Sequence, residues 1–203
     1  MDTASQQITV IGQGAISAVP DMMRLNAGVE VHKAGAGEAF AAVRVAAARL
    51  TRALVEGGVA ANDLRTSDLS LGPEYSAYPK VSGYRAAQGV AVVIRDLSQA
   101  DRIIDLVASI GEEARLNGVS FDVSDPVGPL RQARDRAFQD ARAKAEQYAQ
   151  LSGRPLGQVV GITEVMEPPP MPMLLSAPAE QSSISPGELN VAVALRVSYS
   201  FGA

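Results

Sequence analysis

The sequence contains no cysteine, no tryptophan and a single histidine, His32. Without cysteine there can be no disulfide, no thiol nucleophile, no cysteine-based zinc site and no haem attachment motif. A single histidine also excludes, within one chain, a metal centre that needs two or three imidazole ligands. Aromatic residues make up only 4% of the chain, so its core must be built from Ala, Val, Leu and Ile. We therefore expect no catalytic residues, no metal and no cofactor.

An excess of positive charge and a long apolar run are absent as well. The chain has 18 Lys and Arg against 22 Asp and Glu, and a pI near 5.1, which argues against a nucleic-acid partner. No stretch of about 18 apolar residues is present, so we expect no integral membrane segment. The N-terminus lacks the basic and apolar regions of a signal peptide. Either Met1 is the native start and the protein is cytoplasmic, or the chain is the mature part of an exported protein.

The apolar residues that are present follow two periods. Spacings of three and four predict helices, and strict alternation predicts half-buried strands, of which 189–201 is the clearest. One-sided helices and half-polar strands predict an α+β fold, with mostly antiparallel sheets and amphipathic helices on one face. The expected helices are 38–56, 98–111 and 130–151, and the expected strands are 8–12, 22–32, 64–75, 84–95, 119–123, 156–165 and 189–201.

The order of these elements suggests an internal duplication within one domain, 1–203. A helix followed by two strands occurs twice, and each time the last strand has the longest alternating pattern. We therefore predict two related units, 8–97 and 117–203, bridged by the short helix 98–111. Ser98 is the expected N-cap of that helix.

A proline-rich segment, 167–187, interrupts the regular pattern. It holds six of the twelve prolines, which favour an extended loop or arm. Its apolar residues would not be left uncovered in a water-soluble protein. The segment therefore either folds back on its own domain or docks on another subunit. The candidate contact residues are Met171, Met173, Leu174 and Leu175.

Three tyrosines, Tyr75, Tyr78 and Tyr84, surround the expected hairpin connection 76–83. They could form an interaction surface for a ligand or partner, or pack the hairpin itself. The charged residues of helix 130–151, among them Arg136, Asp140 and Lys144, are most simply a solvated face.

Two further motifs could carry chemistry. The Gly12-Gln13-Gly14 run resembles part of a dinucleotide loop, but Ser17 stands where a third glycine is needed, so a turn at the end of a strand fits better. His32 could be a general base if Glu30, on the same strand face, orients it. The simpler interpretation of His32 is a solvated polar residue at a strand end.

An ordered set of short motifs, spread from about residue 8 to residue 201, resembles the SIMPL-domain family. No single piece is specific, but the complete order is. The pieces are Val10-Ile11-Gly12-Gln13-Gly14, Pro20-Asp21, Leu64-Arg65-Thr66-Ser67, Gly83-Tyr84-Arg85-Ala86, Arg95-Asp96-Leu97, Asn117-Gly118-Val119-Ser120-Phe121, the alanine-rich helix 130–151, Leu156-Gly157 and Ile184-Ser185-Pro186-Gly187-Glu188.

The resemblance implies a bacterial protein of the periplasm or cell envelope, with an α+β fold. Members of this family, whose function is unknown, include periplasmic immunogenic proteins and an oxidative-stress-defence protein, and some form higher-order oligomers. The family has no established catalytic residues. We therefore expect a non-enzymatic, self-associating homo-oligomer linked to stress defence. The alternative is a binding module for a peptide, a glycan or a hydrophobic ligand.

Overall fold

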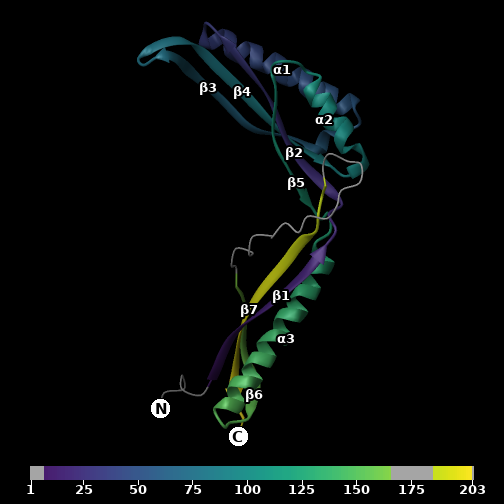
Figure 1. Ribbon diagram of the computed structural model, residues 1–203, viewed down its shortest axis with the longest axis vertical. Coiled ribbons are helices and arrows are strands. Elements are labelled where there is room, and N and C mark those ends of the chain that lie inside the picture. The colour runs from purple at the N-terminus through teal and green to yellow at the C-terminus, as the bar shows by residue number, and fades with distance from the viewer. Residues whose placement is uncertain (1–6, 166–184, 203) are drawn as a thin grey trace. The chain divides into compact units, whose positions relative to one another are not determined.

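The computed structural model describes residues 7–165 and 185–202, which group into two compact units. Of the described chain, unit 1 contains residues 7–19, 125–165 and 187–202, and unit 2 contains residues 20–124 and 185–186. Both units combine helices and strands, and the strands pair antiparallel throughout (Figure 1). The α+β prediction is therefore confirmed.

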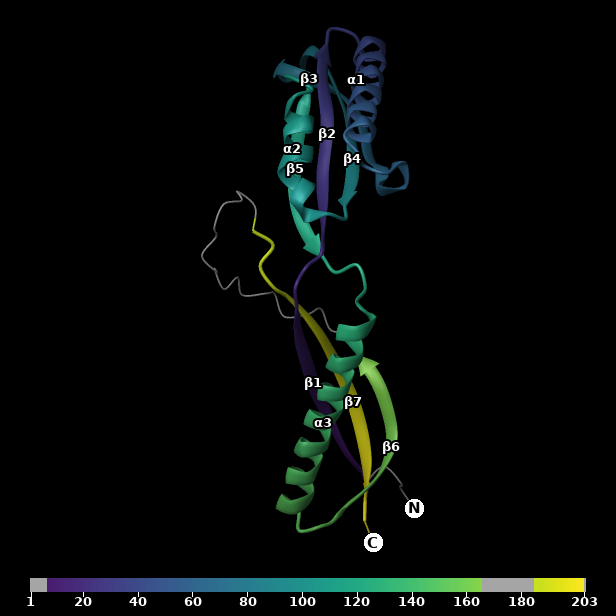
Figure 2. The ribbon, with the colours of Figure 1, turned by 90° about the vertical axis from the view of Figure 1, so that its right-hand side faces the viewer.

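Unit 1 is a three-stranded sheet with one long helix on one face (Figure 2). The strand order is β1-β7-β6, so β7, predicted to cross the middle of a sheet, is central. Val193, Leu195, Val197 and Tyr199 of β7 face the helix and are buried. The elements are β1 (Gln7–Ala18), α3 (Val127–Leu151), β6 (Leu156–Val165) and β7 (Leu189–Phe201).

Unit 2 is a four-stranded sheet of order β3-β4-β2-β5 with its helices packed on one face. The strand β2 supplies one row of buried residues, because every second side chain from Met23 to Val31 faces the helices. Val43, Leu50 and Leu54 of α1 pack on this row. The elements are β2 (Met22–Lys33), α1 (Ala36–Glu56), η2 (Ala61–Asp63), β3 (Leu64–Ala77), β4 (Lys80–Ile94), η3 (Leu97–Gln99), α2 (Ala100–Ala108) and β5 (Ala114–Asp122).

The two units share one topology. In each, a strand leads to a helix and then to two further strands, and the last of these lies between the other two: β6-β7-β1 in unit 1, β3-β4-β2 in unit 2. The boundaries of the two units differ from the predicted 8–97 and 117–203. Because β1 pairs with β7 at the other end of the chain, unit 2 is inserted between β1 and α3.

The expected helix 98–111 also differs from the structure. A short turn, η3, precedes α2, and α2 packs within unit 2 against α1 and β5, so it does not bridge the units. The Asp96 side chain, not that of Ser98, caps the turn by accepting a hydrogen bond from the Ser98 backbone N–H at 3.0 Å.

Unit 1 is held together by an unusually close contact between α3 and β1. Gly12 and Gly14 lie within β1, not at the end of a strand as predicted, and both face the helix. A side chain on Gly12 would overlap the carbonyl oxygen of Ala137, and one on Gly14 that of Ala133. The facing stripe of α3 is correspondingly small, and consists of Ala133, Ala137, Ala141, Ala145 and Ala149, which are all buried.

This close approach lets three charged side chains of α3 reach the free edge of β1. Arg136 donates to the Ala15 carbonyl at 2.8 Å, and Lys144 donates to that of Ile11 at 3.0 Å. Between them, Asp140 accepts the Gln13 N–H at 2.8 Å.

The spacings of the two elements match, because four helical residues rise about 6 Å and two strand residues about 6.7 Å. These α3 residues therefore close an edge that could otherwise pair with another strand, and are not merely a solvated face. The Asp140 pKa is lowered, first by the hydrogen bond from Lys144 and then by that from the Gln13 backbone.

Replacing Gly12 with alanine should destabilise unit 1, because α3 must move away from β1 to admit the methyl group. We expect a loss of about 1–3 kcal/mol in the free energy of unfolding, measured by urea denaturation. Gly161→Ala is the matched control in β6, since its methyl group would meet nothing within 4 Å. Equal effects of the two substitutions would show that the close contact is not what holds α3.

Replacing Arg136, Asp140 and Lys144 together with alanine should open the β1 edge. We expect additional concentration-dependent association, seen as light scattering that rises more steeply with protein concentration than that of the parent protein under the same conditions. The control replaces Arg131, Asp135 and Gln139, which lie on the same helix but contact none of the β1 groups. Similar scattering from both triple variants would refute the edge-closing role.

Candidate functional site

The hairpin of β3 and β4 extends beyond the rest of its sheet. The last residue of β2, Lys33, lies opposite Tyr84, so residues 74–83 form a ribbon of two strands without a third. We call residues 74–83 the ribbon. A two-stranded ribbon buries little apolar surface of its own, so its side chains are available for contact with a ligand or a partner.

Aromatic and apolar side chains gather on this ribbon. Tyr75, Tyr78 and Val81 are 47%, 85% and 44% exposed. The rings of Tyr75 and Tyr78 lie 5.5 Å apart between centroids and are tilted by 54°, a favourable aromatic geometry. The third predicted tyrosine, Tyr84, lies apart from them and packs against the hydrophobic core of unit 2.

The other predicted contact residues are those of the proline-rich segment. Met171, Met173, Leu174 and Leu175 lie outside the described residues. The structural site is therefore built from the ribbon and from the groups at its base.

A charged cluster occupies the base of the ribbon, on the sheet face that the helices leave uncovered. Glu30 and His32 alternate with the buried residues of β2 and so point away from the core. The strand register brings Arg85 of β4 opposite His32, and Arg115 of β5 opposite Gly28.

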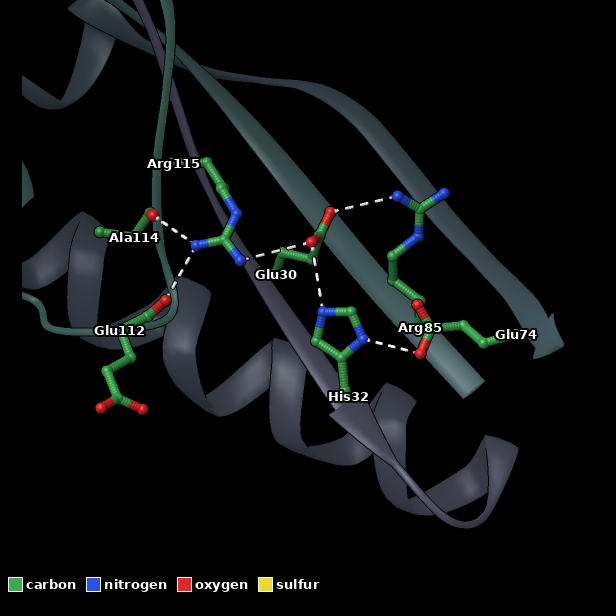
Figure 3. A network of polar contacts seen from close by, with 7 residues as sticks. All are labelled: Glu30, His32, Glu74, Arg85, Glu112, Ala114 and Arg115. Carbon is green, nitrogen blue, oxygen red and sulfur yellow. Dashed lines mark hydrogen bonds and ion pairs between the residues drawn. The ribbon is translucent and has the colours of Figure 1, made fainter. Parts of the chain in front are cut away.

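The cluster is centred on Glu30 and His32 (Figure 3). His32 Nδ1 lies 2.9 Å from Glu74 Oε2, and His32 Nε2 lies 3.3 Å from Glu30 Oε1. Glu30 also faces two cations, Arg85 at 3.6 Å and Arg115 at 3.4 Å. The network thus ties β2 to β3, β4 and β5 where the ribbon leaves the sheet. Sequence analysis paired His32 with Glu30 but missed Glu74, 42 positions away.

The electrostatics of the cluster favour a charged imidazole. The pKa of His32 is raised, chiefly by its hydrogen bond with Glu74; burial opposes this shift, and Glu30 adds a lesser increase. A general base needs a ring nitrogen that is free to accept a proton from substrate. Both nitrogens of His32 face carboxylates instead, so the arrangement suits a structural clamp better than catalysis.

Two further kinds of feature are absent from the described residues, namely a metal-binding cluster and a membrane-spanning helix. Within 7–165 and 185–202, no three His, Asp or Glu side chains converge in a way that could hold a metal ion. Over the same residues, no helix combines the length and apolar character needed to cross a bilayer.

The fold defines the chain as an α+β protein, and sequence comparisons define its family. The SIMPL family model, described as a protein of unknown function (DUF541), matches residues 8–199. The chain belongs to the SIMPL family, which confirms the resemblance predicted from its motifs.

Curated relatives cover most of the chain. The 26 kDa periplasmic immunogenic protein of Brucella melitensis is 32% identical over 97% of this chain and 85% of its own length. The uncharacterized protein YggE of Edwardsiella ictaluri is 30% identical over 76% of this chain and 66% of its own length. YggE of Escherichia coli K12 is 28% identical over 89% and 75%. None of these names mentions an enzymatic activity.

The lone imidazole permits a direct test of the cluster. We expect an NMR titration of the His32 ring protons to give a pKa above 6.5, which Glu74→Gln lowers more than Glu30→Gln does. The raised pKa means that the charged imidazole stabilises the fold fully below pH 6.5, and that this contribution is lost as the pH rises through the folded-state pKa. Because His32 is about half exposed, the stability change should stay below about 1 kcal/mol.

The matched control is Glu113→Gln, which removes a carboxylate of unit 2 that pairs with Arg49 and not with His32. This substitution should leave the titration unchanged. A His32 pKa at or below 6.5, or one insensitive to Glu74→Gln, would contradict the clamp.

Proposed function

We propose that the protein acts without catalysis, as a self-associating component of the bacterial cell envelope, and that the ribbon is its contact surface. The observation that carries this proposal is the exposed Tyr75–Tyr78 pair on a ribbon that lacks a third strand. Tyrosine supplies a large contact area at low conformational cost, and aromatic side chains dominate the binding energy of many interfaces.

The polar base supports the same role. By joining Glu74 to β2, the His32 cluster restricts the direction in which the ribbon leaves the sheet. A surface that is held before binding loses less entropy when a partner docks on it. The charged cluster thus holds the apolar tip of the ribbon in one orientation before a partner binds.

The envelope location is supported by the Brucella melitensis relative, whose name describes it as periplasmic. The link to stress defence, which the resemblance implies, stays a prediction. A chain without cysteine could support such a role only through binding or assembly, since its six methionines are its sole sulfur groups.

Self-association can be tested on the full chain by sedimentation velocity. We expect species larger than the 21.2 kDa monomer, and a shift towards the monomer in the double variant Tyr75→Ser and Tyr78→Ser. The matched control is Val127→Ser, which removes a 69% exposed apolar side chain at the start of α3. Its assembly should be unchanged.

A monomer at high concentration would refute self-association. Assembly that survives the double tyrosine variant would remove the ribbon from the interface. Deletion of residues 168–182 would then ask whether the contact lies in the proline-rich segment, as also predicted from sequence.

The second candidate is a binding module that uses the same two tyrosines. The tilted ring pair offers an aromatic surface to a peptide, a glycan or a hydrophobic ligand. This function is favoured over self-association if the protein is monomeric and the double tyrosine variant loses a ligand while keeping its thermal stability.

A further inference from the structure

The helical layer of unit 2 leaves the edge strand β3 uncovered. Leu69 and Leu71 of β3 pair with Gln88 and Ala86 of β4, and paired residues of antiparallel strands point to the same face. Ala86 is buried in the core beneath the helices, so both leucines lie on the helix side of the sheet. They are nevertheless 54% and 47% exposed, because α1 packs mainly on β2 and β4.

A groove lies between α1 and the sheet, and its lining residue from the sheet, Gln88, is the residue that pairs with Leu69. Its volume is about 640 Å³. Its wall on α1 contains small and apolar residues, including Ala47, Ala48 and Val55, and Gln88 contributes from the sheet. Small side chains allow another element to approach α1 closely, as the alanines of α3 do in unit 1.

Two cations stand on the rim of this groove. Arg44 and Arg52 both line it and lie two turns apart on α1, roughly 12 Å along the helix axis. Neither forms an ion pair with any described residue, whereas Arg49, on the opposite flank of α1, pairs with Glu113. Glu56 also lines the groove, so its border carries two arginines and one glutamate around the apolar residues, and its net charge is positive.

The form of β3 indicates which kind of partner fits. A strand would need a regular backbone edge, but the register of β3 shifts between Thr66 and Leu69, and Pro73 lacks an N–H. Bulges and prolines are devices that oppose strand addition at an edge. A helix needs only the side-chain surface, and would continue the layer begun by α1 and α2.

We propose that this groove binds an amphipathic helix of a partner protein, whose apolar stripe contacts Leu69 and Leu71 and whose acidic border pairs with Arg44 and Arg52. This is the helix-in-groove mode of recognition, with charge selecting the partner. The site is separate from the ribbon and does not depend on the proposed self-association.

The test uses three labelled 20-residue peptides with one leucine stripe bordered by Glu, by Lys or by Gln. Fluorescence anisotropy with the full chain should show that the Glu peptide binds at least tenfold more tightly than the Lys peptide. The double variant Arg44→Glu and Arg52→Glu should reverse this order. Leu71→Asp should abolish binding while the circular-dichroism melting curve stays unchanged, because Leu71 lies outside the buried core.

A charge-matched control replaces Arg65, on the other face of β3, and Arg131 of α3 with glutamate. It should bind the Glu peptide as the parent protein does, and so should the double tyrosine variant of the ribbon. Failure of the Glu peptide to bind, or equal binding of the Glu and Lys peptides, would overturn the proposal. So would a dimer of the protein alone that Leu71→Asp dissociates, since a second copy would then occupy the groove.

Discussion

The close contact between the alanine stripe of α3 and the two glycines of β1 is the constraint on which the rest of unit 1 depends. Gly12 and Gly14 bring the helix axis so near to the strand that the flanking side chains of α3 can reach around its edge. Arg136, Asp140 and Lys144 then occupy backbone positions that a neighbouring strand would use. The close packing of α3 and the hydrogen bonds that its side chains form with the β1 edge therefore depend on each other. A methyl group on Gly12 would disturb both.

Unit 2 has the same topology as unit 1, but the edge of its sheet is protected against strand pairing in a different way. Its strand β3, at the sheet edge, carries exposed leucines and continues into a ribbon with two exposed tyrosines. Where unit 1 closes an edge with charges, unit 2 interrupts it with a register shift and Pro73. The charged side chains at the β1 edge and the irregular backbone of β3 both oppose unselective strand pairing. A partner must therefore be recognised through side chains and not through backbone groups. This is why both proposals rest on the outer surfaces of unit 2.

The charged cluster at the base of the ribbon also suits a protein that acts through side-chain contacts. His32 lies between two carboxylates, and Glu30 in turn faces two arginines, so the positive and negative groups alternate through the network. Such an arrangement orients a strand well and transfers protons poorly, because it leaves no ring nitrogen available. A protein that works by contact needs the first property and not the second.

The sequence by itself determined the type of nearly every element, and the bounds of β6 and β7 to the residue, because periodicity is a local property of the chain. It also determined the family, through the order of its motifs. Tertiary structure alone decided that β1 pairs with β7, that α3 side chains close the β1 edge, and that Glu74 meets His32. These contacts join residues 42 to 193 positions apart, as in the pairs His32–Glu74 and Gln7–Ser200. The spacing of side chains within one segment carries no information about which distant segment it will meet.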